Sequence, residues 1–441
     1  MHLTNITIDG LHGSISKFVE FKPELNLLVG INGSGKTSVL NVIEWLLSVN
    51  LHKLCTTEFV RLALQFTYKT HKLELEAVQQ KGQLRLNLHG VVKRDFSPIV
   101  VELLKPPSLI NPAEHEMLLE HYGRLGPEKK EKPLWEFLKG IPKPVAITLD
   151  RTISAEFDDI KYLELETGQR VSRRRITRSP LDKVREVTAV RYAQYRAKLI
   201  ELNDELKARI VMSALSEPTK SRRTVAPKIS PAELSELEVK VTDYLAVVLR
   251  GKSENAQIGS FFRRAQALVQ KAAGADKASS QDMLYMMFAR QYQQIESLAQ
   301  AFNEYEIASA SAHESLKTYL NKINMFMADS KKVVLFDEQT NELCFKFVNK
   351  DGEHEEDTRS INCLASGERQ ILILFTFLAF VAIPDSIFIV DEPELSLHPK
   401  WQRDFLESFV ALQPKKTQLL LATHSPEIAG KRKADCVVLK A

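Results

Sequence analysis

The stretch that most constrains the fold of this chain is "GINGSGKT" at residues 30–37, which matches the pattern GxxxxGK[ST]. The unbroken apolar run "LNLLV" precedes it, and apolar residues at helical spacing (Val39, Val42, Ile43 and Leu46) follow it. A glycine-rich turn between a buried strand and a helix lets backbone amides surround a phosphate at the positive end of the helix. We therefore expect an α/β domain that binds a nucleotide at this turn.

Chance is a weak explanation for this pattern, because a chain of average composition and this length shows it about 1–2% of the time. In the arrangement that the pattern indicates, Lys36 reaches the β- and γ-phosphate oxygens and Thr37 holds Mg²⁺. The residues expected to bind the nucleotide are Asn32, Gly33, Ser34, Gly35, Lys36, Thr37 and Ser38.

A second motif, "SIFIVDEPELSLHPKWQ", places Asp391 and Glu392 directly after four apolar residues. Carboxylates at the carboxyl end of a core strand lie where open α/β sheets bind ligands. We expect Asp391 to be a Mg²⁺ ligand and Glu392 to orient and activate the attacking water. Acidic residues at the start of a helix are the ordinary alternative for such a pair.

Two shorter features complete the pattern. "LASGERQ", residues 364–370, puts Ser366 and the amide of Gly367 at the start of an apolar helix, which is either an anion site or a plain helix cap. His424 follows the apolar run "LLLAT", so we expect its side chain near the γ-phosphate.

Taken together, the four motifs resemble, in content and order, those of ATP-binding-cassette ATPases of the SMC, RecF and OLD type, and the match covers roughly residues 1–150 and 335–435. The resemblance implies ATP and Mg²⁺ as cofactors, with His424 as the histidine switch. It also implies that Ser366, Gly367 and Glu368 of one subunit close on the ATP held by another. A single chain then has no complete site, so the chain is expected to form at least an ATP-dependent dimer.

Several positions depart from the commonest cassette pattern. The loop after the acidic strand carries Ser396, and it has His398 where many members have aspartate. This "DEPELSLHP" form is similar to that of overcoming-lysogenisation-defect ATPases and of stand-alone ATPases in bacterial antiviral operons. Asp150 and Arg151 stand where the family has a glutamine loop. Phe18 and Phe21 are available to stack on adenine, but core positions suit both better.

The fold class that we predict is a mixed α/β domain with a P-loop core and an antiparallel meander, interrupted by a helical, short coiled-coil-like insertion. "FVRLALQFTYKTHKLELEAVQQKGQLRLNLHG" alternates as a meander does, and a proline-rich passage (98–144) links it to the strand "VAITLD". The stripe Tyr192, Tyr195, Leu199, Leu202 and Leu206 indicates paired helices. The expected parts are 1–155, the insertion 156–330, and 331–441, which carries the acidic strand, the histidine and the stretch 364–370, called the signature segment below.

Charge is unevenly distributed along the chain. The net charge is only +4, but residues 170–228 hold 16 Lys+Arg against 6 Asp+Glu. The expected basic patch is Arg173, Arg174, Arg175, Arg222 and Arg223. Nucleic acid, an acidic protein and plain solvent remain three open explanations for it.

Other features exclude several classes of protein. The longest apolar run, "ILILFTFLAFVAI", has 13 residues, whereas a membrane span needs about 20. The four cysteines lack metal-ligand spacing, and the N-terminus lacks the plan of a signal peptide. We expect a soluble, cytoplasmic protein with no membrane partner.

Two functions remain open. In the first, the chain is an ATPase that acts as an oligomeric sensor or scaffold and holds a separate effector, expected to be a Toprim-type nuclease, in antiviral defence. The PARIS ATPase is the nearest resemblance and the Septu ATPase the second. Only residues 431–441 are left after the matched region, so the resemblance implies that the effector is a separate chain. A phage trigger protein and nucleic acid are further partners that this function allows. The alternative is a DNA-repair or recombination ATPase that clamps DNA; the long insertion argues against a transporter.

Overall fold

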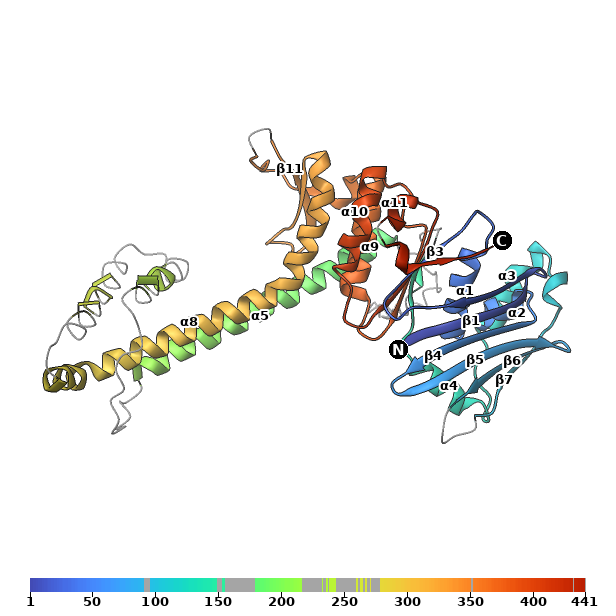
Figure 1. Cartoon of the computed structure of the whole chain (residues 1–441), viewed down its shortest axis with the longest axis horizontal. Coiled ribbons are helices and arrows are strands. Elements are labelled where there is room, and N and C mark those ends of the chain that lie inside the picture. Colours follow the sequence, from blue (N-terminus) through green and yellow to red (C-terminus); the bar gives the residue numbers. More distant parts are fainter. Residues whose placement is uncertain are drawn as a thin grey trace, which may run out of the picture. The chain divides into compact units, whose positions relative to one another are not determined.

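The computed structural model describes residues 1–90, 96–148, 153–154, 179–215, 278–349, 352–430 and 432–440, with separate helical residues between 232 and 270. The chain forms two compact units: unit 1 comprises Met1–Tyr192 and Lys317–Ala441, and unit 2 comprises Ala193–Leu316. Both ends of the chain, blue and red in Figure 1, belong to unit 1. The predicted fold class, an α/β domain interrupted by a helical insertion, is therefore confirmed.

A mostly parallel sheet forms the centre of unit 1, in the order β15-β3-β14-β13-β8-β9. Its middle strands are apolar on both faces and fully buried, as strands covered on both sides must be. Only β9 runs antiparallel to its neighbour. The strands are β3 (Leu25–Val29), β8 (Val145–Ile147), β9 (Ile153–Ser154), β13 (Ile387–Asp391), β14 (Gln418–Thr423) and β15 (Cys436–Val438).

An antiparallel sheet in the order β2-β1-β4-β5-β6-β7 forms a second layer of unit 1. The buried residues of its strands share one core with helix α1, so the predicted meander is confirmed as part of a larger sheet. The strands, several of which are labelled in Figure 1, are β1 (His2–Leu11), β2 (Ile15–Glu20), β4 (Arg61–Tyr68), β5 (His71–Gln80), β6 (Gln83–His89) and β7 (Ile99–Glu102).

The passage 98–144 is more than the link that its prolines predicted, because it folds into β7 and two helices. Pro112 occupies the first turn of α3, where the missing N–H is no loss, and the Asn111 side chain caps that helix. Pro133 lies in the first turn of α4 in the same way. The helices of the first half of unit 1 are α1 (Lys36–Leu47), α2 (Leu51–Thr56), α3 (Pro112–Gly123) and α4 (Lys132–Lys139), with a short turn at Pro107–Leu109.

The second half of unit 1 begins with a three-stranded sheet, which includes the predicted hairpin. Its strands are β10 (Lys332–Phe336), β11 (Leu343–Phe347) and β12 (Arg359–Ser360). The helices are α9 (Ser366–Thr376), α10 (Pro399–Val410) and α11 (Pro426–Ala429), and α9 continues as a π-helical segment at Phe377–Val381. Short turns lie at Ala328–Ser330, Ile361–Cys363 and Lys433–Asp435. Most of the longest apolar run is buried here, and its last residue, Ile383, is exposed. Within the described residues, no helix has both the length and the apolar character to cross a membrane.

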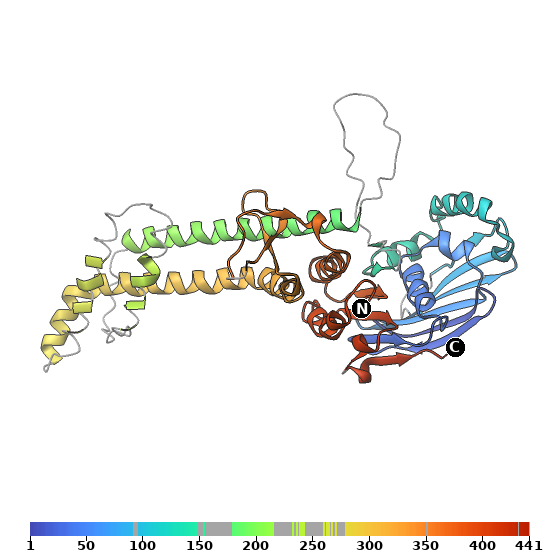
Figure 2. The ribbon, with the colours of Figure 1, turned by 90° about the horizontal axis from the view of Figure 1, so that it is seen from above.

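Unit 2 is built on the long helices α5 (Pro180–Leu215) and α8 (Ala278–Met327), which lie side by side in both views (Figures 1 and 2). The predicted stripe is the less exposed face of α5, with Leu202 and Leu206 buried. The ring of Tyr195 stacks on His313 with centroids 5.2 Å apart. The two helices thus pack along the stripe.

Candidate functional site

The predicted site residues of the two chain halves meet at one edge of the parallel sheet. In the register of the strands, Thr423 pairs with Val29, and Ala422 pairs with Asp391. The loops that follow β3, β13 and β14 therefore leave the sheet side by side. This edge brings together the glycine-rich turn, the acidic pair and the histidine.

The glycine-rich turn holds its lysine inside the loop. Gly33 and Gly35 have φ of 80° and 89°, in the left-handed region that favours glycine. Lys36 is only 4% exposed, and its Nζ donates to the carbonyl oxygens of Gly30 at 3.0 Å and Ile31 at 3.3 Å. The ammonium group is thus held inside the loop by two backbone carbonyls.

Helix α1 begins at Lys36, so the amides of its first turn face this loop. Asn32, Gly33 and Thr37 are exposed, Ser34 is buried, and Gly35 and Ser38 are half-buried. Ser34 Oγ is buried without a hydrogen-bond partner among the described residues. A phosphate oxygen in the loop would accept the hydrogen bond that the Ser34 hydroxyl can donate.

Asp391 ends β13 and is 6% exposed. Neither of its carboxylate oxygens has a hydrogen-bond partner within the described part of the chain. Burial raises the pKa of Asp391, and the nearby Thr37 hydroxyl and Lys36 ammonium offset only part of that effect. A buried, unpaired carboxylate is costly unless a cation joins it. Asp391 and Thr37 together are oxygen ligands of the kind that Mg²⁺ prefers, so this corner fits the ion.

Glu392 and His424 form a pair beside that corner. His424 Nε2 lies 3.1 Å from Glu392 Oε1, and His424 Nδ1 lies 3.3 Å from Lys36 Nζ. Glu392 adopts a left-handed backbone with φ 52°, a strained conformation that is typical of functional sites.

The electrostatic surroundings of Glu392 suit a general base. Burial raises the pKa of this carboxyl to about 8, with further contributions from the neighbouring Glu394 and Asp391, while Lys36 lowers it. A proton acceptor works best when its pKa is close to the working pH. A carboxylate with a pKa in this range can accept a proton near neutral pH.

Glu394 is a part of the site that the sequence motifs did not identify. Its Oε1 accepts hydrogen bonds from Thr423 Oγ1 at 2.7 Å, from the His424 amide at 2.6 Å and from the Ser425 amide at 2.9 Å. The only sequence signal was a third acidic residue in "DEPE". Its hydrogen-bond donors lie about thirty residues further along the chain, so a motif read from neighbouring residues could not predict these contacts.

The predicted signature residues divide into two groups. Ser366 is exposed at the start of α9, while Gly367 and Glu368 are buried. Glu368 is fully engaged within its own chain: Lys332 Nζ lies 2.8 Å from both carboxylate oxygens. Ser330 Oγ donates to Oε1 at 2.6 Å and the Ala365 amide donates to Oε2 at 2.8 Å. The Glu368 side chain therefore braces the start of the helix.

The loop that carries Ser396 and His398 lies against the signature. A Cβ on Gly367 would lie 2.6 Å from the Ser396 carbonyl oxygen, so only glycine fits there. Ser396 itself has φ 70°. The exposed His398 caps α10, because its Nδ1 accepts from the Lys400 amide at 3.2 Å. Ser396 thus touches the signature segment, whereas His398 starts a helix.

Three further expectations concern the two phenylalanines, the residues at the glutamine-loop position and the basic patch; the structure contradicts one of them in part and does not describe the other two. Phe18 is 62% exposed on β2, so the expectation of a core position is wrong for it: residues 15, 17 and 19 take the inward-facing positions of that strand, and Phe18 falls between them. Phe21 packs partly buried against the core. Asp150 and Arg151, and the basic patch Arg173, Arg174, Arg175, Arg222 and Arg223, lie outside the described residues.

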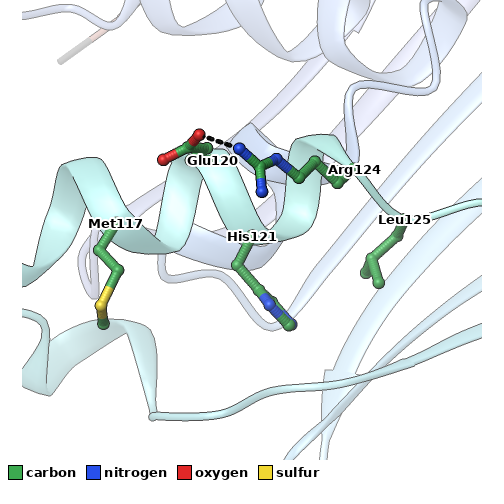
Figure 3. Close-up of a pocket in the computed structure, with 5 residues that line it drawn as sticks. All are labelled: Met117, Glu120, His121, Arg124 and Leu125. Carbon is green, nitrogen blue, oxygen red and sulfur yellow. Dashed lines mark hydrogen bonds and ion pairs between the residues drawn. The ribbon is translucent and has the colours of Figure 1, made fainter.

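A hollow of about 320 Å³ lies beside α3, apart from all of these residues (Figure 3). Met117, Glu120, His121, Arg124 and Leu125 line it. Glu120 and Arg124 pair with each other across one helical turn. Its lining shares no residue with the edge of the parallel sheet.

One of three comparisons with known proteins identifies an ATPase family. The family described as "AAA ATPase domain" matches residues 1–429. One similar solved structure is the Smc head domain with an extended coiled coil bound to the C-terminal domain of ScpA, derived from Pyrococcus furiosus; the identity is 12%, with 100% of this chain and 94% of that chain covered and a TM-score of 0.38. Another is the SmcHead bound to the C-winged helix domain of ScpA, at 10% identity, with 99% and 94% covered and a TM-score of 0.39. Likenesses this distant carry no argument about the site. No relative was found among the curated proteins.

Proposed function

The chain belongs to the AAA ATPase domain family, and from that premise we propose that it binds ATP with Mg²⁺ at the edge of the parallel sheet and hydrolyses the ATP. One observation carries the proposal: the buried Lys36, the unpaired Asp391 carboxylate and the Glu392–His424 pair converge on one loop. Lys36 and Asp391 are buried charged groups, which are costly unless they are paired or serve a ligand.

The residues take the following roles. Lys36 and the amides of residues 32–38 hold the phosphates, and Thr37 and Asp391 would hold Mg²⁺, which neutralises charge on the phosphate oxygens when bound. Glu392 accepts the proton of the attacking water. His424, within reach of both Lys36 and Glu392, fixes the orientation of that base.

We further propose that the active form contains at least two copies of the chain. Ser366 is exposed although it begins a buried helix, and it is free to contact a nucleotide held by another copy. Two apolar side chains of the site loops are also open to solvent, Ile31 at 68% and Leu395 at 44% exposed. By resemblance to cassette ATPases, we expect Ser366 and Gly367 of one copy to complete the nucleotide site of the other copy.

The finer role that we propose is that of an ATP-driven switch in the cytoplasm, which holds and releases a separate effector, a Toprim-type nuclease, in antiviral defence. The support is the "DEPELSLHP" form of the acidic loop, which resembles stand-alone ATPases of the PARIS and Septu kinds. A phage trigger protein would act on the same assembly. Co-purification with the product of the neighbouring gene, with and without ATP, tests this role, and no complex in either condition would contradict it.

The basic segment 170–228 favours a second candidate, an ATPase that clamps DNA. Phosphate contacts lose affinity steeply with salt. Titration of duplex DNA at two salt concentrations therefore tests this candidate, and weak, salt-insensitive binding would exclude it. In the described part of this segment Lys198 and Lys207 already pair with acidic neighbours, which weakens this candidate.

Steady-state hydrolysis by the wild type and by Glu392→Gln tests the ATPase itself. We expect the glutamine variant to bind ATP normally and to lose at least about 100-fold in kcat, because an amide cannot accept the proton. Sedimentation of the same variant should show ATP-dependent self-association. Wild-type turnover by Glu392→Gln would refute the assignment of the base.

A further inference from the structure

The Glu394 carboxylate joins two loops of the site. Residue 394 belongs to the turn after β13, and its three hydrogen-bond donors lie at the last residue of β14 and in the first two residues of the loop that follows. Strand β14 ends at Thr423, and the next two amides donate to Glu394 instead of to a strand. Bonds from an amide or hydroxyl to a charged acceptor are about twice as strong as neutral ones.

Beyond its contribution to the raised pKa of Glu392, the Glu394 carboxylate is bonded only through its first oxygen among the described residues. Oε2 is buried and accepts no hydrogen bond from any residue that the structure describes. A buried carboxylate with one oxygen unused costs free energy, which three donors on the other oxygen must offset. The feature that this arrangement stabilises is the conformation of the histidine loop.

That conformation decides where His424 lies. The His424 imidazole contacts Lys36 through Nδ1 and Glu392 through Nε2, and the backbone amide of the same residue donates to Glu394. We propose that Glu394 is a positioning residue for hydrolysis: it fixes the loop 423–425 so that His424 faces Lys36 and Glu392. The inference rests on the proposed ATPase function and names a residue that acts through His424, without contact to the nucleotide.

Hydrogen exchange of the loop tests the contact without requiring activity. In Glu394→Ala, we expect the amides of His424 and Ser425 to exchange at least about tenfold faster than in the wild type, because their acceptor is gone. Glu394→Gln keeps one carbonyl oxygen and should retain part of the protection. The matched control is Glu427→Ala, which removes an exposed carboxylate paired with Arg403 close to the same loop. Unchanged exchange in Glu394→Ala would overturn the inference.

Kinetics then test whether the contact matters for hydrolysis. We expect Glu394→Ala to lower kcat roughly 10- to 100-fold with KM for ATP changed less than about threefold, because the residue orients a group and binds no ATP. On the plateau of each variant's pH profile, where the direct effect of Glu394 on the pKa of Glu392 no longer alters the rate, Glu394→Ala, His424→Ala should be no slower than His424→Ala alone, since both changes then act through one side chain. Additive losses, or equal losses in KM, would contradict a positioning role.

The two failures are distinguishable. A wild type that hydrolyses no ATP refutes the proposed function, together with the kinetic part of the inference, whatever the exchange data show. A wild type that hydrolyses ATP, with His424→Ala slow and Glu394→Ala normal, refutes only the inference.

Discussion

Two regions of unit 1 differ in whether their buried polar groups have partners. One is the edge of the parallel sheet that carries the glycine-rich turn, Asp391 and His424, called the nucleotide edge here, and the other is the signature segment 364–370. At the nucleotide edge, the oxygens of Asp391 and Ser34 are buried without partners among the described residues. In the signature segment, Glu368 is 3% exposed, and Lys332, Ser330 and the Ala365 amide engage both of its oxygens. In the proposed function a ligand completes the first region, whereas the buried carboxylate of the second is already paired within the folded chain, and Ser366 there is exposed.

This contrast predicts different outcomes for mutations of buried charges. A charge at the nucleotide edge should matter mainly for binding and hydrolysis. A charge in the signature segment should matter mainly for the free energy of unfolding, and for hydrolysis only through the shape of the segment. The following predictions test that division, from the largest expected effect to the smallest.

The largest effect on stability should come from Lys332→Met. The lysine side chain is 12% exposed and the paired Glu368 side chain 3%, so the variant leaves a buried carboxylate without its cation. Removal of one partner of a buried pair costs about 3–5 kcal/mol of unfolding free energy. Denaturant unfolding measures this cost, and Lys332→Met with Glu368→Gln should recover much of it. A stable single variant would show that the signature does not depend on the pair.

The same pair predicts a response to acid. Burial alone would raise the pKa of Glu368, but Lys332, Ser330 and the Ala365 amide together hold it below its ordinary value. A lowered pKa in the folded state means that the stabilisation is complete above the pKa of the unfolded chain, about 4.5, and is lost as the pH falls through the folded pKa. The wild type should therefore lose more stability than Glu368→Gln below pH 4.5.

A smaller effect is expected from Gly367→Ala. The new Cβ would lie 2.6 Å from the Ser396 carbonyl oxygen, so the loop at 396 must move. Overpacking of this kind costs about 1–3 kcal/mol. Gly126→Ala is the matched control, because nothing lies within 4 Å of its Cβ position. Equal unfolding free energies for the two variants would show that the signature and the 396 loop are not in tight contact.

The smallest effect is expected in unit 2. Arg209 pairs with Glu304 between α5 and α8, but their side chains are 54% and 44% exposed. Water and salt screen such a pair, and many surface pairs contribute nothing measurable. Arg209→Ala should leave the thermal midpoint of unfolding unchanged. A clear drop in the midpoint would mean that unit 2 depends on this pair.

The parts of the candidate site that lie within one short segment could be predicted from the local sequence pattern. The glycine-rich turn, the acidic strand and His424 each follow a buried apolar run, and the register of three parallel strands places them together. The α/β fold and the paired helices followed from the same reasoning. The side-chain assignments themselves remain predictions that mutation must test.

Contacts between distant segments explain what the sequence did not predict. Glu394 meets Thr423, and Glu368 meets Lys332, across about thirty residues or more, so no spacing rule connects them. Phe18 was expected in the core, but its position on β2 faces outward. The passage 98–144 was interpreted by its proline content alone, although Pro112 and Pro133 stand where helices begin.

The most direct test of the account is calorimetric titration of the wild type and of Lys36→Ala with Mg²⁺ and a non-hydrolysable ATP analogue. Lys36 is the buried cation of the glycine-rich loop, so the account predicts that the wild type binds and that the variant loses at least about 100-fold in affinity, or about 2.7 kcal/mol. The exposed Lys69→Ala should bind as the wild type does. Equal affinities of the wild type and Lys36→Ala would contradict the central claim.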